Sequence, residues 1–433
     1  MRGVLVVLVS LGMSSVLAAQ VVVPAKLSLA DALRLADERS PDLRVARSEV
    51  DAVVADRITA AARPNPALTF DTVGYPPLGG APPANQTLSV RVDQEIETSG
   101  RRGLRVQSAD EARVTADRRY SDARRRVALA VQRAYWQAAL AWADHQTAES
   151  VLADIDRTIN LSRARAAQGE IAGAEVRRLE LERLRFVEDL FAADLALKNG
   201  RAALLTLMGV PDLTQPFEPI ENLASSLGVV TSTGVVLVPL ALDAPVDADV
   251  VRATALLARP DLLALESEAV RLDTETRLQR ALRTPNVTIG GGYQRDLGQS
   301  AVIFGATIPL PFANRNQGPV ARADAERAGA TARTEALRNL VLLDVQQAVN
   351  AVIVNRQRVK YLQTEYLANA LAARDTSLAS YRLGAGDLLE YLDAQRVYRD
   401  TLRTYNRALF DAKVSLSELA AAAGAAVGGS SSR

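Results

Sequence analysis

One pattern of elements occurs twice in the chain, and this duplication constrains the fold more than any other feature. Each copy is predicted to contain two helices, a proline-rich break, two short alternating segments and a very long helix that turns at a glycine. The copies are offset by about 215 to 219 residues, as from Pro41 to Pro260 and from Gly169 to Gly384. This period exceeds the roughly 20–50 residues of solenoid repeats. The pattern therefore predicts two domain-sized copies, an organisation typical of pseudo-symmetric membrane conduits.

Proline and glycine indicate where the copies begin and end, because proline fits the first position of a helix and glycine follows the last. The expected parts are a signal peptide at 1–19, a first copy at 20–209, a linker at 210–246, a second copy at 247–423 and a tail at 424–433. The linker is rich in proline and is expected to be irregular, with a little local structure. The Gly/Ser-rich tail is expected to be disordered.

The first residues have the pattern of a secretory signal peptide. Arg2 gives a positive start, an apolar stretch from Val4 to Leu11 follows, and small residues around Ala19 provide a cleavage site. The alternative is a short membrane anchor, but the stretch is too short to span a bilayer comfortably. No run of 18 or more apolar residues follows, so no transmembrane helix is expected.

Each copy contains a predicted β-hairpin, at 66–96 in the first and at 286–308 in the second. Apolar and polar residues alternate in both, as in Leu88-Ser89-Val90-Arg91-Val92, and turn-rich loops separate the alternating runs. The residues of the opposing face are small and polar, as in a water-filled lumen, and each run has about the length of a tilted transmembrane strand. The alternative is a hairpin lying on a soluble core, but no other β-structure is predicted to pack against it.

Four strands are too few to close a membrane barrel, which needs about eight. An open sheet edge leaves backbone groups unpaired, and lipid does not tolerate this. If these strands cross a membrane, the chain must therefore oligomerise and share one barrel.

The helices are predicted to be unusually long. Arg101 to about Ala167 contains no proline, and at about 1.5 Å per residue this helix would reach roughly 100 Å. In the second copy, Val359, Leu362 and Tyr366 are expected to continue one apolar face at coiled-coil-like spacing. Helices of this length suit a tube that spans a compartment and not a compact enzyme.

The chain lacks the residues of a catalytic or cofactor site. It has no cysteine, and its one histidine, His145 beside Trp142, has the setting of a packing or surface residue. Gly290-Gly291-Gly292 lies in a strand pattern with no helix after it, so it indicates close backbone approach and not a phosphate site. The net charge of +1 gives no general attraction to nucleic acid. No enzyme activity, cofactor or metal site is predicted.

Together with this duplicated order of elements, three short motifs give the chain its resemblance to a known family. They are Pro64-Asn65-Pro66, Gln94-Glu95-Ile96-Glu97-Thr98-Ser99-Gly100-Arg101-Arg102, and Ile308-Pro309-Leu310-Pro311-Phe312 followed by Asn314-Arg315-Asn316-Gln317-Gly318. The chain resembles the TolC family of outer membrane efflux proteins over nearly its whole mature length. Within that family it is most similar to the heavy-metal branch, the CzcC-like components of cobalt–zinc–cadmium or copper–silver exporters.

This resemblance implies a mainly α protein with a small β part. A homotrimer would form a 12-stranded β-barrel in the outer membrane, four strands from each chain, continuous with a periplasmic α-helical barrel. The implied partners are outer membrane lipid, a periplasmic adaptor protein and an inner-membrane pump of the resistance-nodulation-division type. The tube would conduct heavy-metal cations passively. The alternatives are a drug or solute conduit of the same family and, from another class, a periplasmic coiled-coil scaffold with no pore.

The resemblance also implies a periplasmic gate, which docks the adaptor, at the helical turns. Its pattern falls on Gly169, Glu175, Tyr381, Gly384, Glu390 and Asp393. The last two lie three residues apart, so their carboxylates can share one helix face. In a threefold assembly they would form an acidic ring that favours cations. The alternative is a pair of ordinary solvated carboxylates near a helix N-terminus. Where a family pattern places an arginine, this chain has Gly386, so a charged latch there would be weaker or built differently.

Overall fold

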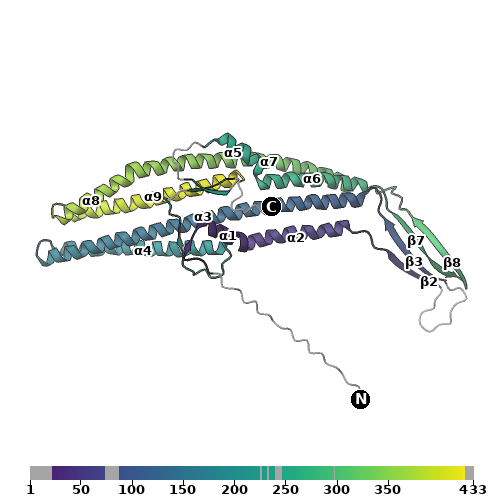
Figure 1. Ribbon diagram of the computed structural model, residues 1–433, viewed down its shortest axis with the longest axis horizontal. Coiled ribbons are helices and arrows are strands. Elements are labelled where there is room, and N and C mark those ends of the chain that lie inside the picture. Colours follow the sequence, from purple (N-terminus) through teal and green to yellow (C-terminus); the bar gives the residue numbers. More distant parts are fainter. Residues whose placement is uncertain are drawn as a thin grey trace, which may run out of the picture.

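The computed structural model describes residues 22–73, 87–224, 227–231, 234–238, 246–296 and 298–424, with only the backbone described at 227–231 and 234–238. The expected signal peptide and residues 425–433 of the expected tail lie outside these ranges. The described chain is a long rod of helices with a β-sheet at one end (Figure 1). The helices are α1 (Leu29–Arg39), α2 (Pro41–Ala61), α3 (Arg101–Ala167), α4 (Gly173–Leu207), α5 (Ala248–Ala258), α6 (Pro260–Ala281), α7 (Gln317–Tyr361), α8 (Ala368–Arg382) and α9 (Leu388–Ala422).

The helix α3 runs from the sheet to the far end of the rod, as predicted, and its 67 residues correspond to about 100 Å. A second long helix runs beside it and is formed by α7, a π-helical turn η1 (Leu362–Leu367) and α8. The π-turn inserts one residue and rotates the following side chains by about 100°. This explains why Tyr366 is exposed while Val359 is buried, so the prediction that both lie on one apolar face is wrong.

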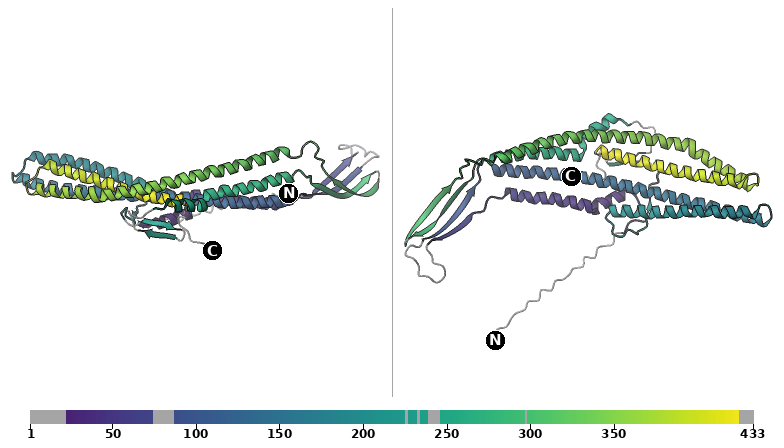
Figure 2. Two further views of the ribbon diagram at one scale, coloured as in Figure 1. Left: turned by 90° about the horizontal axis from the view of Figure 1, so that it is seen from above. Right: turned by 180° about the vertical axis from the view of Figure 1, so that it is seen from behind.

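The helices form four columns along the rod (Figure 2). The helix α3 packs against α2, α4, α6 and α9, and α7 packs against α6 and α9. Across the rod, the order is therefore α2 with α4, then α3, then α6 with α9, then α7 with α8. The columns α2/α4 and α7/α8 form the two outer edges.

Prolines and glycines position the breaks between stacked helices. Pro41 and Pro260 occupy the first turns of α2 and α6, where a missing N–H costs no hydrogen bond. After α4, Gly209 adopts a φ of +69°, and a Cβ there would lie 2.6 Å from the Arg39 carbonyl oxygen. After α9, Gly424 has a φ of +77°, and a Cβ there would lie 2.8 Å from the Arg259 backbone nitrogen at the α5–α6 break. Both breaks therefore require glycine at the end of the returning helix.

The sheet contains β2 (Ala67–Val73), β3 (Thr87–Ile96), β7 (Val287–Asp296) and β8 (Gln299–Thr307). The order is β2-β3-β7-β8, and all neighbours are antiparallel. The central pairing of β3 with β7 joins the hairpins of the two halves. Strands β2 and β8 each leave one edge unpaired in the described chain.

The segment between the two halves contains three short strands. The short strand β4 (Glu218–Pro219) pairs in parallel with β1 (Lys26–Leu27), and β5 (Leu227–Thr231) pairs with β6 (Gly234–Val238) as a hairpin. These short strands lie in the linker, for which a little local structure was expected. Phe217 and Leu223 are buried in a core cluster with Tyr135 and Trp136 of α3, which fixes this segment to the middle of the rod.

One helix departs from the expectation that none could cross a membrane. The helix Gln317–Arg382 contains an 18-residue window with a mean hydropathy of 1.2, of which 28% is buried. By length and composition alone, this helix could span a bilayer. The exposed leucines of α7 lie on an outer edge of the rod, where an apolar surface also suits a neighbouring helix.

Candidate functional site

The sheet at one end of the rod has one apolar face and one polar face. One row of register partners joins Phe70, Val90, Tyr293 and Val302 on the same side. Phe304 also lies on this face and is 85% exposed. A monomer leaves this apolar surface exposed, so an apolar phase or another protein must cover it.

The opposite face is polar, and two of the three consecutive glycines, Gly290 and Gly292, make room on it. A Cβ at Gly290 would lie 1.9 Å from Asp93 Oδ1, and a Cβ at Gly292 would lie 2.2 Å from the Val90 carbonyl oxygen. Above these glycines, Arg91 Nε lies 2.9 Å from Asp93 Oδ2. Gly290 and Gly292 therefore serve close packing around this ion pair, as the sequence predicted, whereas Gly291 faces Phe304 on the apolar side.

Two helical turns form the opposite end of the rod (Figure 1), and glycine ends the descending helix in both. Gly169 has a φ of +75° and Gly384 a φ of +74°. The Glu170 N–H then donates to the Arg165 carbonyl, and the Ala385 N–H donates to the Ser380 carbonyl, each at 2.9–3.0 Å. These bonds satisfy carbonyls that the helix end would leave unpaired.

A pair of stacked tyrosines holds the two turns together. The rings of Tyr381 and Tyr391 lie 5.9 Å apart at an angle of 8°, and both side chains are buried. The Tyr381 hydroxyl lies 2.8 Å from Ser162 Oγ of α3. Burial raises the pKa of the Tyr391 hydroxyl. The stack therefore anchors α8 and α9 on α3.

Arg165 near the end of α3 adds a charged link between the turns. Its Nη1 donates to the Tyr381 carbonyl at 3.1 Å, and its Nε donates to Glu170 at 3.1 Å. The guanidinium also lies 6.0 Å from the centre of the Tyr381 ring. One side chain thus connects the α3–α4 turn to the α8–α9 turn.

The predicted acidic residues lie around this tip. Glu175 is half-buried in the first turn of α4, whereas Glu390 and Asp393 are exposed in the first turns of α9. Asp393 forms an ion pair with Arg396 of its own helix. Because both partners are exposed, this pair contributes little to stability, but it offsets part of the charge of Asp393.

The position that departs from the family pattern is sterically closed. A Cβ at Gly386 would lie 2.8 Å from the Ser380 Cβ. An arginine there would require the α8–α9 turn to shift. The charged contact at this tip comes from Arg165 of the other hairpin.

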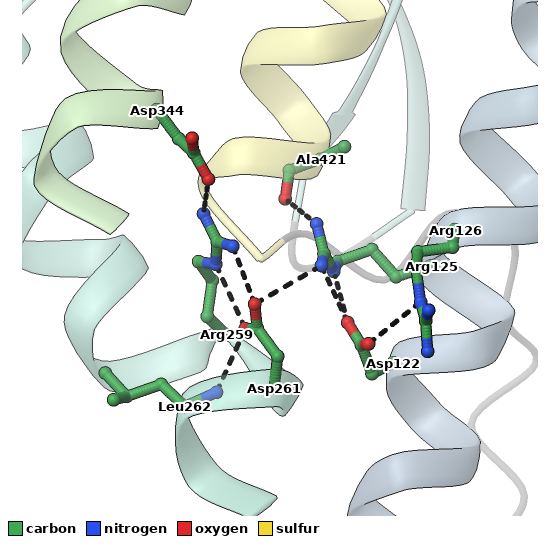
Figure 3. Close-up of polar contacts among 8 residues, drawn as sticks. All are labelled: Asp122, Arg125, Arg126, Arg259, Asp261, Leu262, Asp344 and Ala421. Atoms are coloured by element: carbon green, nitrogen blue, oxygen red, sulfur yellow. Dashed lines mark hydrogen bonds and ion pairs between the residues drawn. The ribbon is translucent and has the colours of Figure 1, made fainter. Parts of the chain in front are cut away.

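A second polar cluster lies at mid-rod, where the α5–α6 break meets α3, α7 and the end of α9 (Figure 3). Arg259 binds Asp261 through two hydrogen bonds of 3.0 and 2.6 Å, and it binds Asp344 at 2.8 Å. Arg125 donates to the Ala421 carbonyl at 3.1 Å. Burial alone would raise the pKa of Asp261, but the hydrogen bonds and charge of Arg259 outweigh burial and lower it. The cluster therefore holds the C-terminal end of α9 against α3.

The family model for outer membrane efflux proteins matches residues 32–210 and 251–425 of the chain. The chain belongs to the outer membrane efflux protein family. The match covers both halves, from α1 to the end of α4 and from α5 to the end of α9. Proteins of this family are transport conduits and not enzymes. The chain is therefore an outer membrane protein whose helical rod extends into the periplasm.

Individual relatives agree with this family. The chain is 24% identical over 379 residues to the cobalt-zinc-cadmium resistance protein CzcC of Cupriavidus metallidurans, covering 86% of this chain and 83% of that protein. The crystal structure of CusC superposes with a TM-score of 0.72 at 19% identity over 92% of both chains. The Vibrio cholerae outer membrane protein VceC superposes with a TM-score of 0.70 at 20% identity, over 92% and 96% of the two chains. The structures show that the fold is shared.

Within the family, the six predicted tip residues separate into two groups. Tyr381 and Gly384 lie against Arg165, and Gly169 ends the neighbouring turn. Glu175, Glu390 and Asp393 lie on the flanking helices and make none of these contacts. The sequence predictions missed Arg165, Ser162 and Tyr391. Only Tyr391 carried a signal, because its spacing from Leu388 and Leu392 places it on the apolar stripe of α9.

Proposed function

We propose that the protein is the exit duct of a tripartite efflux system and conducts heavy-metal cations from a periplasmic adaptor and an inner-membrane pump to the outside. The observation that carries this proposal is the open-edged sheet with an exposed apolar face at the end of a helical rod. Family membership supports the location of this sheet in the outer membrane. The duct itself is passive in this proposal, and the inner-membrane pump supplies the energy for transport.

The duct is a homotrimer in this proposal. The free edges of β2 and β8 can pair with each other between neighbouring chains, which removes every open edge from lipid. Three chains would then supply the 12 strands of one barrel. The alternative scaffold without a pore is not retained, because it leaves the apolar face of the sheet without a role.

The two outer helical columns would form the contacts between neighbouring chains along the rod. On the α2/α4 column, exposed apolar residues follow a helical spacing on α4, namely Leu181, Leu184, Phe191 and Leu195. On the α7/α8 column, Leu340, Leu343 and Val354 are exposed. In a closed ring each α2/α4 column meets the α7/α8 column of the next chain, and these apolar residues leave water.

Heavy-metal cations are the proposed substrate because one relative, CzcC, is a cobalt-zinc-cadmium resistance protein. Glu390 and Asp393, repeated threefold, would place an acidic ring at the periplasmic entrance. The chain has no cysteine, one histidine and three methionines, so it offers few ligands that retain soft metals. Metal selection then lies with the pump and adaptor. A drug or solute duct remains the second candidate, since a passive tube carries little information about its cargo.

Growth of a strain deleted for this chain tests the substrate class. Paralogous ducts should be removed first, and growth measured on graded zinc, cobalt, cadmium, copper and silver beside dyes and antibiotics. Sensitivity to metals alone is the expected result, and it would identify the ion. Sensitivity to organic compounds alone would contradict the metal proposal in favour of the second candidate.

The entrance is tested by single-channel recording in a planar bilayer. Replacing Glu390→Ala and Asp393→Ala together should reduce the preference for cations over anions. The matched control replaces Glu49→Ala and Asp51→Ala, two exposed carboxylates of α2 far from the tip. An unchanged ion preference in the tip variant would mean that these are ordinary solvated carboxylates.

A further inference from the structure

The segment between β8 and α7 exposes an unusual amount of apolar surface. It follows the last strand residue, Thr307, and precedes α7. Ile308 is 53% exposed, Leu310 is 68% exposed and Phe312 is 80% exposed. Three large apolar side chains within five residues form a contiguous patch that a soluble surface rarely carries.

This patch continues the apolar face of the sheet. Val302, Phe304 and Ala306 lie on that face of β8 at every second position, and Ile308 and Leu310 follow at the same spacing. The chain then turns at Pro311, where the Phe312 N–H donates to the Leu310 carbonyl at 2.9 Å. Exposed apolar residues therefore continue past the end of the strand, at the end of the sheet where the helical rod begins (Figure 2). In an outer membrane barrel, this end of the sheet faces the periplasm.

Backbone pairing with a second copy cannot cover the patch. The ladder between β7 and β8 ends at the pair Thr288 and Thr307. Beyond it, Pro309 and Pro311 have no N–H group to donate to a neighbouring strand. The patch thus lies outside the shared barrel's hydrogen-bonded part.

Two arginines lie next to the patch at the start of the helical rod. Arg283 lies two residues after the last residue of α6, and Arg315 lies two residues before the first residue of α7. The Asn316 Nδ2 group donates to the Gln279 carbonyl at 2.7 Å, so these two helix ends lie together. Within the described ranges, neither arginine is paired with a carboxylate. Two such cations beside an apolar row match the phosphates of a phospholipid leaflet, since arginine can extend from an apolar stem to the headgroups.

We propose that residues 308–315 are a second membrane anchor, in which Ile308, Leu310 and Phe312 enter the periplasmic leaflet of the outer membrane while Arg283 and Arg315 bind phospholipid phosphates. This inference rests on the proposed barrel. It adds a lipid-binding collar at the junction of the barrel and the rod. Aromatic and basic residues at such a boundary fix the depth of a membrane protein.

Tryptophan fluorescence in vesicles of brominated phosphatidylethanolamine and phosphatidylglycerol tests the anchor. The variants are Phe312→Trp at the collar, Phe304→Trp on the barrel face and Leu383→Trp at the exposed far tip. The native tryptophans, Trp136 and Trp142, lie about 50 Å or more along α3 from the sheet, so the wild-type protein provides the background. Bromine quenches tryptophan only at short range.

The expected result is loss of the added emission for Phe312→Trp and Phe304→Trp but not for Leu383→Trp. Quenching of Phe304→Trp alone would overturn the collar while leaving the proposed barrel intact. A blue-shifted but unquenched Phe312→Trp would mean that a second copy covers the patch, and this also overturns the collar. Quenching of neither variant would overturn the proposed barrel itself.

A second pair of variants tests the phosphate contact. In the Phe312→Trp background, Arg283→Gln with Arg315→Gln should weaken quenching in vesicles that contain phosphatidylglycerol. The control is Arg280→Gln with Arg322→Gln, because these arginines already bind Asp324 and Glu326. Equal quenching in both double variants would overturn the role of the arginines.

Discussion

Arg165 near the end of α3 donates a hydrogen bond of 3.1 Å to the backbone carbonyl of Tyr381, 216 residues later near the end of α8. This contact joins the two helical turns that form the periplasmic tip of one chain. Because the same guanidinium also binds Glu170, a single side chain holds both turns. The two turns are therefore joined within one chain without an arginine at position 386.

Replacing Arg165→Ala should loosen the tip. A hydrogen bond to a charged group contributes about 1.5–3 kcal/mol. The variant loses the bond to the Tyr381 carbonyl, which weakens the contact between the two turns. We expect a higher resting conductance in a planar bilayer. Arg163→Ala is the control, since Arg163 is exposed and binds Glu180 within the α3–α4 hairpin only. Equal conductance of the Arg165→Ala and wild-type channels would contradict the expectation that Arg165 holds the tip closed.

The two turn glycines provide a matched pair of variants. Alanine at a positive φ costs about 1–2 kcal/mol, so Gly169→Ala and Gly384→Ala should both lower the thermal unfolding temperature. At Gly384 the new Cβ would also lie 3.2 Å from Arg165 Nη2, whereas at Gly169 it would meet open space. Only Gly384→Ala should therefore also raise the resting conductance. A rise of the same size in both variants would mean that strain in the turn, and not displacement of Arg165, opens the tip.

The mid-rod cluster should contribute strongly to stability. Replacing Arg259→Met leaves Asp261 without its bidentate partner, and breaking a buried ion pair costs about 3–5 kcal/mol. The unfolding temperature in detergent should fall markedly. Asp344→Asn is the comparison, since the Asp344 side chain is 48% exposed and exposed pairs contribute about 0–1 kcal/mol. A smaller effect at Arg259 than at Asp344 would contradict this description of the cluster.

Lys413 of α9 should make stability depend on pH in the alkaline range. It is fully buried with its Nζ 4.7 Å from the centre of the Trp136 ring. Burial lowers the pKa of its ammonium group to about 8, and the charge of Glu221 offsets only part of this effect. Between pH 8 and about 10.5 the unfolded chain binds more protons at this group than the folded chain, so stability should rise with pH there.

The Lys413→Met variant checks this dependence. It should remove the rise in unfolding temperature between pH 8 and 10, where the raised pKa of Tyr135 keeps that neighbouring hydroxyl protonated. Lys198→Met serves as a control, since Lys198 lies on the surface and pairs with Asp194. A rise that persists in Lys413→Met would assign the pH dependence to another group.

Local signals were sufficient to predict most of the fold. The bounds of α3, Arg101 and Ala167, followed from the absence of proline and the glycine at 169. The strands followed from strict alternation, and Gly290 was correctly interpreted as a position of close approach. The π-turn after Tyr361 was not predicted, because an inserted residue leaves the apolar spacing of a short segment nearly unchanged.

The contacts of the tip could not be predicted, because they join residues that are distant in sequence. Arg165 has the pattern of an ordinary surface arginine among many, and only the packing of α8 on α3 brings it to Tyr381. The same holds for Lys413, which meets Trp136 across two helices. Gly169 and Gly384 lie at the two helical turns, as the sequence predicted, but the family resemblance offered no substitute for the arginine missing at Gly386.

The mass of the purified protein in detergent, corrected for bound detergent, tests the central claim most directly. The free edges of β2 and β8 and the apolar outer columns require neighbours, so we expect three times the mass of one chain. A stable monomer would contradict the duct, because four strands cannot close a barrel in lipid.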